Sequence, residues 1–311
     1  MSKSNGRART ALKKWVDLRS PSGDDGRLLI IKYHRAEKSA HQGSGGRTLE
    51  EFDAQIELLG SVFNTLTVAD AAQRIRTGTL PERALCITFD DGYADNYVTA
   101  LPILERYGLK ATFFVPSGLI EQSIMWSDQI ANAFATAAED GLPQMRNYLA
   151  DAGMPVRFPD LMAKLKYMSV DAQETIVRGL SKFGNIESDS CQLMSADQVR
   201  GLVARGMEVG GHTVNHTILT NASDELAYDE IKNCKLQLEV IIGEPVQSFA
   251  YPNGRRDQDY SERDVGIVRD AGFAAAVNTE FGLARGGDHV YELPRIPQYF
   301  ITPLRLFRVY T

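Results

Sequence analysis

Short apolar segments alternate with amphipathic helical patterns along most of this chain, and this alternation constrains the fold more than any other feature. Helix signals such as the capping box formed by Thr48 and Glu51 separate the apolar segments. Repeated strand–helix units place strands parallel, with helices outside the sheet. We therefore expect an α/β fold of about seven parallel strands, which suggests a barrel, although an open doubly wound sheet has the same local pattern. The predicted strands are Leu28–Tyr33, Ala84–Phe89, Ala111–Val115, Met207–Gly210, Val246–Tyr251, Phe273–Val277 and Glu292–Ile296.

Two segments depart from the alternation. Residues 1–24 are mostly polar, which predicts an N-terminal tail before a single domain over residues 25–311. Residues from about 121 to 200 carry several amphipathic helical patterns and no convincing strand. We therefore expect an all-helical insertion within that domain.

Composition and charge exclude several classes of protein. The chain has 34 Lys and Arg against 40 Asp and Glu, and this net charge of −6 disfavours nucleic acid as a partner. Its longest uncharged stretch, Val209–Ser223, is rich in polar residues, whereas a membrane span needs about 18 mostly apolar ones. No apolar signal region follows the basic N-terminus, and Cys86, Cys191 and Cys234 are few and far apart. We expect a cytoplasmic protein without a transmembrane segment, and the sequence does not indicate its oligomeric state.

Adjacent carboxylates follow one of the predicted strands in the segment Thr88–Gly92. At such a position one carboxylate can bind a metal while its neighbour acts as a base. The Asp-Gly pair is also a strong turn signal, so Asp90 and Asp91 alone leave both interpretations open.

Two histidines follow another predicted strand. The i, i+4 spacing of His212 and His216 lets both imidazoles converge on one ion, and these are two of only five histidines in the chain. Two histidines and a carboxylate would leave positions open for water, which is typical of a catalytic metal. Polar residues follow most of the strands, at the edge that carries active sites in parallel α/β folds. They are His34, Asp90, Asp91, His212, Tyr251 and Arg295.

Three motifs in this order resemble those of the polysaccharide deacetylases (carbohydrate esterase family 4). They are Thr88-Phe-Asp-Asp-Gly92, His212-x-x-x-His216 and Phe249-Ala-Tyr-Pro-Asn-Gly254. The segments Ile31–Arg35, Ala111–Val115 and Leu293–Ile296 fit as well, so the resemblance covers roughly residues 28–300.

This resemblance implies a distorted (β/α) barrel and hydrolysis of an N-acetyl group on a sugar. It also implies that Asp90 is the general base and that Asp91, His212 and His216 hold one divalent metal. Zn²⁺ is the expected ion, with Co²⁺, Ni²⁺ or Mn²⁺ as alternatives. The backbone N–H of Asn253 could be an oxyanion donor.

The chain departs from the family pattern at two places. Many members have an arginine two residues before the proline of the third motif, where it steadies the catalytic aspartate, whereas this chain has Ala250 there. Arg295 is a possible replacement, and a structural ion pair is the alternative role for this residue. Many members also supply a general-acid histidine from a Leu-x-His motif near the C-terminus, which this chain lacks. We favour His34 as the substitute acid, with a buried structural histidine as the alternative.

The expected substrate is an N-acylated amino sugar of a glycan or a lipid-linked glycan precursor. Trp126 and Tyr251 are candidate substrate contacts, although core packing also explains such aromatic residues. The helical insertion would wall one side of the cleft. A deformylase or amidase acting on a small molecule or a sugar precursor is the alternative enzyme, and a non-catalytic carbohydrate-binding protein is the alternative without catalysis.

Overall fold

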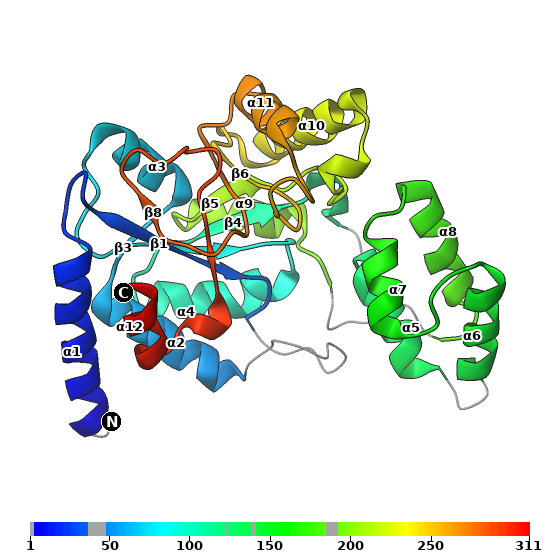
Figure 1. The fold of residues 1–311 in the computed structure, drawn as a ribbon, viewed down its shortest axis with the longest axis horizontal. Coiled ribbons are helices and arrows are strands. Elements are labelled where there is room, and N and C mark those ends of the chain that lie inside the picture. Colours follow the sequence, from blue (N-terminus) through cyan, green and yellow to red (C-terminus); the bar gives the residue numbers. More distant parts are fainter. Residues whose placement is uncertain (1–2, 37–47, 122–123, 138–140, 185–191) are drawn as a thin grey trace.

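A mostly parallel sheet forms the centre of the computed structural model, which describes residues 3–36, 48–121, 124–137, 141–184 and 192–311 (Figure 1). Along the main path its strand order is β7-β6-β5-β4-β3-β1-β8. The parallel strands on this path are β1 (Arg27–Tyr33), β3 (Ala84–Phe89), β4 (Thr112–Val115), β5 (Glu208–Gly211), β6 (Ser248–Ala250) and β7 (Ala275–Val277). The longest pairing joins β1 and β3, from Leu28 opposite Ala84 to Tyr33 opposite Phe89.

The C-terminal segment curls this sheet toward a barrel. Leu293 forms a parallel bridge with Val277 of β7, and β9 (Ile296–Pro297) then pairs with β1. One segment thus links strands near the two opposite ends of the strand order. The expected α/β fold with a distorted barrel is confirmed. Two short strands were not predicted, and the predicted strand Glu292–Ile296 is reduced to β9 and this bridge. The short strands are β2 (Asn64–Leu66), parallel to β3, and β8 (Ala284–Arg285), antiparallel to β1.

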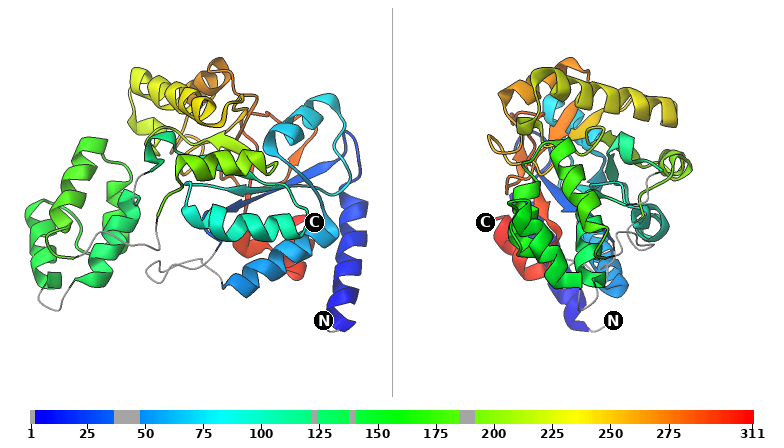
Figure 2. Two further views of the ribbon diagram at one scale, coloured as in Figure 1. Left: turned by 180° about the vertical axis from the view of Figure 1, so that it is seen from behind. Right: turned by 90° about the vertical axis from the view of Figure 1, so that its right-hand side faces the viewer.

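Helices cover the outside of the curled sheet (Figure 2). Thr48 and Glu51 form the predicted capping box at the start of α2, and Gly243 ends α10 with a left-handed φ of 76°. These helices are α2 (Leu49–Val62), α3 (Val68–Thr77), α4 (Leu101–Arg106), α9 (Ala196–Ala204), α10 (Asp224–Ile242) and α11 (Glu262–Asp270).

Alternate residues of the strands enter two different hydrophobic clusters. Leu28 and Ile30 pack inside the curled sheet, whereas Leu29 and Ile31 pack toward helices such as α2. The same period of two carries the inward-facing row of β1 to Lys32 at the carboxyl end. The row thus changes from apolar to charged where the candidate site begins.

The N-terminal segment forms a helix. Helix α1 (Lys3–Arg19) buries Leu12 and Val16 and contacts α2 and the last helix, α12 (Pro303–Val309) (Figure 1). The expectation of a polar tail over residues 1–24 is therefore wrong for this helix, because two apolar side chains at i and i+4 anchor it.

Four helices between β4 and β5 form a group with a hydrophobic cluster of their own, which includes Ile130, Leu149 and Leu161. The carboxyl ends of the strands face this group (Figure 1). Helix α9, whose first residues fall within the expected insertion, packs on the outside of the sheet instead, because Val199 and Leu202 join the same hydrophobic cluster as Leu29 and Ile31. The four helices are α5 (Trp126–Thr136), α6 (Gly141–Asp151), α7 (Phe158–Leu165) and α8 (Val170–Leu180).

None of the helices in the described residues has the length and apolar character needed to cross a bilayer. The thiols of Cys86 and Cys234 are free and buried. Cys191 lies outside the described residues.

Candidate active site

A cleft of about 1270 Å³ lies between the carboxyl ends of the strands and the α5–α8 helices. Its floor contains the two adjacent aspartates and both histidines of the second motif. Its outer wall includes Met162 and Lys166 from the helices and Arg255 and Asp259 from the loop after β6. The predicted site residues in the lining are His34, Asp90, Asp91, Trp126, His212, His216 and Asn253.

Asp91, His212 and His216 form a compact group in which one ligand atom of each residue lies within 4.8 Å of the others. Asp91 Oδ1 is 3.4 Å from His212 Nε2 and 3.2 Å from His216 Nε2. This oxygen is buried and has no other hydrogen-bond partner among the described residues. The sequence prediction grouped these three residues, and the structure brings them together.

The hydrogen bond of His212 indicates what this group can hold. Its Nδ1–H donates to the carbonyl oxygen of Ala250 at 2.7 Å, and because a carbonyl can only accept, a neutral His212 ring carries its proton on Nδ1. The Nε2 lone pair then faces the carboxylate of Asp91. Two acceptors this close repel unless a proton or a cation lies between them. Imidazole nitrogen and carboxylate oxygen are ligands that Zn²⁺ accepts, so these residues fit a divalent metal.

The backbone around this group adopts left-handed conformations. Positive φ angles occur at Asp91 (75°), Thr213 (59°), His216 (57°) and Asn253 (58°). Residues other than glycine adopt this region only at a cost, and such residues concentrate at functional sites. The turns thereby direct side chains from three separate segments into one space.

Asp90 forms a buried bidentate ion pair with Arg295. The two guanidinium nitrogens Nη1 and Nη2 donate to Oδ1 and Oδ2 at 2.7 and 2.8 Å. Arg295 also donates from Nε to the carbonyl oxygen of Asn278 at 2.8 Å and from Nη1 to Thr88 Oγ1 at 3.1 Å. Arg295 thus contacts the first aspartate although 205 positions separate them.

The surroundings keep both aspartates ionised. Burial alone would raise the pKa of Asp90, but the positive charge of Arg295, its hydrogen bonds and the nearby histidines together outweigh burial and lower that pKa. Burial opposes ionisation of Asp91 too, but the nearby imidazoles of His34, His212 and His216 hold its pKa well below the usual range. Asp90 is therefore a fixed, charged acceptor whose partner is the arginine, whereas Asp91 faces the histidines.

Two further titratable side chains from the carboxyl end of β1 line the cleft. His34 opens onto the cleft, and poorer hydration of its charged form there lowers its pKa, against the opposing charge of Asp91. Burial and the nearby Arg295 lower the pKa of Lys32 to about 8. Lys32 was not predicted as a site residue, although this lysine precedes His34 by two residues and so lies on the same side of the strand.

Asn253 and Trp126 line the cleft, whereas Tyr251 does not. Among the described residues, none accepts a hydrogen bond from the backbone N–H of Asn253. The Tyr251 ring is fully buried, stacks on Tyr260 at 3.9 Å and donates its hydroxyl to the carbonyl of Tyr291 at 3.0 Å. The expectation that the Tyr251 side chain contacts substrate is therefore wrong.

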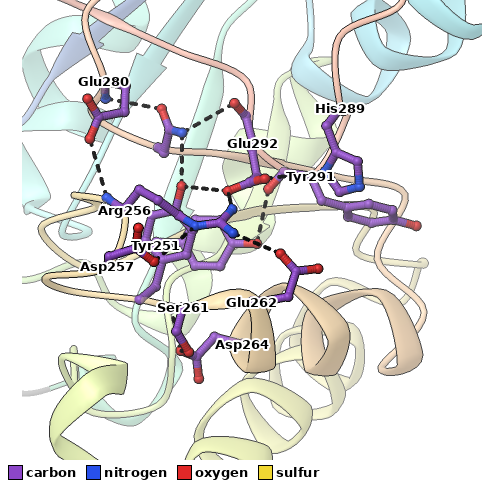
Figure 3. Close-up of polar contacts among 12 residues, drawn as sticks. Tyr251, Arg256, Asp257, Ser261, Glu262, Asp264, Glu280, His289, Tyr291 and Glu292 are labelled. Carbon is purple, nitrogen blue, oxygen red and sulfur yellow. Dashed lines mark hydrogen bonds and ion pairs between the residues drawn. The ribbon is translucent and has the colours of Figure 1, made fainter.

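A polar network supports the loop after β6, which carries Asn253. Figure 3 shows Arg256 between Glu262 and Glu292, next to Tyr251. Its backbone N–H also donates to Glu280 at 3.3 Å. Tyr260, on which the Tyr251 ring stacks, donates its hydroxyl to Glu292 at 3.1 Å. The buried Tyr251 side chain therefore helps to support this loop.

Glu230 of α10 is a second residue that the sequence analysis missed. It is buried beside the cleft and accepts hydrogen bonds from the backbone N–H and the side-chain Nδ2 of Asn215, at 2.9 and 2.7 Å. Because Asn215 directly precedes His216, Glu230 fixes the turn that carries this histidine. The sequence holds no local signal for a contact between a loop and a helix that follows it.

Comparisons with known proteins decide the family. The model of the family described as polysaccharide deacetylase matches residues 77–276. The chain belongs to this family. The matched region contains Asp90, Asp91, His212 and His216, whereas Arg295 and His34 lie outside it. The resemblance found in the sequence is therefore confirmed.

A curated relative and two of the solved structures resemble the chain over most of its length. YxkH of Bacillus subtilis (strain 168), whose name places it among the polysaccharide deacetylases, is 23% identical over 285 residues, which cover 91% of this chain and 74% of that protein. The deacetylase PplD of Streptococcus pyogenes, solved in complex with acetate, has a TM-score of 0.64 and 20% identity, covering 92% of this chain and 98% of PplD. IcaB from Ammonifex degensii has a TM-score of 0.62 and 19% identity, covering 94% and 97% of the two chains. These structures share the fold of this chain.

Proposed function

We propose that this chain is a metal-dependent hydrolase that removes N-acetyl groups from amino sugars of a glycan or a lipid-linked glycan precursor. One observation carries the proposal: a buried, arginine-paired carboxylate, Asp90, adjoins a separate carboxylate and two histidines that suit a divalent metal. Membership of the polysaccharide deacetylase family supports the same reaction. A protein that only binds carbohydrate needs no such base.

The division of labour follows from the surroundings of each group. Asp91, His212 and His216 would hold the ion, for which we propose Zn²⁺, and a bound ion would activate a water and polarise the acyl carbonyl. Asp90 would accept the proton of the attacking water. Its lowered pKa keeps it ionised, and the two hydrogen bonds from Arg295 fix its orientation.

Three further roles belong to groups elsewhere on the cleft. The backbone N–H of Asn253 would donate to the developing oxyanion. His34 would give a proton to the departing amine, since a histidine is well matched to this task near neutral pH. Trp126, which lines the cleft at the start of α5, would stack on a sugar ring.

The test is release of acetate or formate from a panel of N-acylated sugars by chelator-treated protein, with and without added Zn²⁺, Co²⁺, Ni²⁺ or Mn²⁺. We expect acetate release that depends on the added ion. The control variant His216→Ala should lose both the bound metal and the activity. Formate release would assign the chain to the deformylases, and no release from any sugar by metal-loaded protein would contradict the proposal.

A further inference from the structure

Three aromatic rings form an exposed patch, here called the aromatic rim. Phe281 is 57% exposed and Tyr299 is 56% exposed, which is unusual for two large aromatic rings that lie near each other in space. Phe300 lies between them, with its ring centroid 4.8 Å from that of Phe281 and 4.9 Å from that of Tyr299. The rim therefore presents a continuous aromatic surface.

Contacts beneath the rim hold it in place. Gln55 of α2 donates from Nε2 to the carbonyl oxygens of Gln298 and Ile301, at 3.0 and 2.9 Å, on the two sides of Tyr299 and Phe300. The guanidinium of Arg305 lies 5.8 Å from the centre of the Phe300 ring and donates to the carbonyl of Tyr299. A fixed surface loses little conformational entropy when it binds a ligand.

The rim continues the candidate active-site cleft. Tyr299 lines the cleft itself, together with Pro297 and Gln298. In the segment that carries Phe281, Thr279 lines the cleft two residues before that ring. A chain that leaves the cleft on this side must therefore cross the aromatic surface.

The chemistry of the rim suits a sugar ring. A pyranose ring directs its hydroxyl groups outward and presents C–H groups on its face, and such a face packs on an aromatic ring without burying an unpaired hydroxyl. We propose that the aromatic rim binds a pyranose ring of the substrate glycan, at a distance along the chain from the residue that is deacetylated. This inference rests on the proposed function, because it names the same glycan as the ligand.

The experiment compares binding of N-acetylglucosamine dimer and hexamer by calorimetry, in full-length, zinc-loaded protein carrying Asp90→Asn to prevent turnover. We expect the hexamer to bind more tightly than the dimer. The double variant Phe281→Ala/Tyr299→Ala should lose about 5–10-fold of that advantage, the worth of one good aromatic contact. Tyr299→Phe, which keeps the ring, should retain it.

The matched control is Tyr228→Ala on α10, which removes a tyrosine of similar exposure (46%) that does not line the cleft. This variant should bind both oligomers like the parent. Equal binding of dimer and hexamer by the parent, or an unchanged advantage in the double variant, would overturn the inference. Loss of binding to phosphatidylcholine vesicles, with oligomer binding unchanged, would identify the rim as a membrane contact instead.

These outcomes separate the inference from the proposed function. If the rim inference fails alone, the protein still releases acetate from glycans, and the rim variants release it with the same dependence on chain length. If the proposed function fails alone, no acetate is released, but the hexamer advantage and its loss in the double variant persist.

Discussion

The floor and the outer wall of the cleft are held in different ways. On the floor, Asp90 and Arg295 are almost completely buried and joined by two short hydrogen bonds. On the outer wall, Tyr167, which follows α7, is 41% exposed and reaches the loop after β6 through Asp259 at 3.0 Å and Gln258 at 2.7 Å. The groups proposed for chemistry are thus fixed by backbone and burial, whereas the groups that could select a substrate rest on a few surface contacts.

This contrast predicts how substitutions should act. Removing one member of a buried, charged pair leaves the other without compensation, so its effect should be large. Removing one hydrogen bond at a surface contact costs little, because water replaces the lost partner.

Asp90→Asn should reduce turnover by about 10²–10⁴-fold, the usual worth of a general base, while metal content stays near that of the parent. Asp91→Asn is the matched control, because it changes the adjacent carboxylate and should lose the metal. Steady-state kinetics with metal analysis of both zinc-loaded variants checks this pair. Loss of metal from Asp90→Asn would show that the two aspartates have been assigned the wrong roles.

His34→Ala should lower turnover by about 10²-fold, because the departing amine then lacks its proton donor. Metal binding and the thermal unfolding midpoint should change little, since the His34 side chain opens onto the cleft. The test compares turnover of a substrate having an amine leaving group with that of an acetate ester, whose leaving group needs less protonation. Equal losses on both substrates would count against the role of acid.

Lys32→Met should stabilise the metal-free protein by about 1–3 kcal/mol below pH 8. The pKa of Lys32 falls to about 8 in the folded state, so between that pH and about 10.4 the unfolded chain binds more protons and stability rises with pH. The variant should lack this rise. Urea unfolding of both proteins at pH 7 and pH 10 measures it, and an equal pH dependence in the two would refute the burial of a charged lysine.

Tyr167→Phe should have the smallest effect, about 0.5–1.5 kcal/mol on local opening of the outer wall, because it removes only the hydroxyl that bridges Asp259 and Gln258. Hydrogen exchange should accelerate in α7 and α8 and stay unchanged in β1 and β3. A comparable acceleration in those strands would mean that the floor and the outer wall unfold together and are not held independently.

The sequence predicted most of the floor and little of the wall. Strands such as Ala84–Phe89 are continuous apolar runs, and polar residues that follow them must meet at one edge of a parallel sheet. The family resemblance, by contrast, offered Arg295 as a replacement for the missing arginine that steadies Asp90, with a structural ion pair as the alternative, and the two side chains are joined by hydrogen bonds. The contacts of Tyr167 depend on how a helical group packs against a distant loop, which no local pattern encodes.

Other differences have local causes. The sequence of helix α1 resembles a polar tail because its many basic and polar residues mask the anchoring pair of Leu12 and Val16. Strand β8 has only two residues, too few for a period of two to appear. Tyr251 follows a strand, as the residues that line the cleft do, but its ring stacks on the buried ring of Tyr260 and does not reach the cleft.

The left-handed turns at Asp91, His216 and Asn253 have a consequence for protein engineering. Transplanting the three candidate metal ligands to another scaffold would need a host backbone with the same turns, because the residue types alone do not orient the ligand side chains toward one another. Directed evolution faces a matching restriction, because β-branched residues are strongly disfavoured at these positions whatever their chemistry. Libraries that redesign specificity should therefore leave the strand ends unchanged and vary the α5–α8 helices.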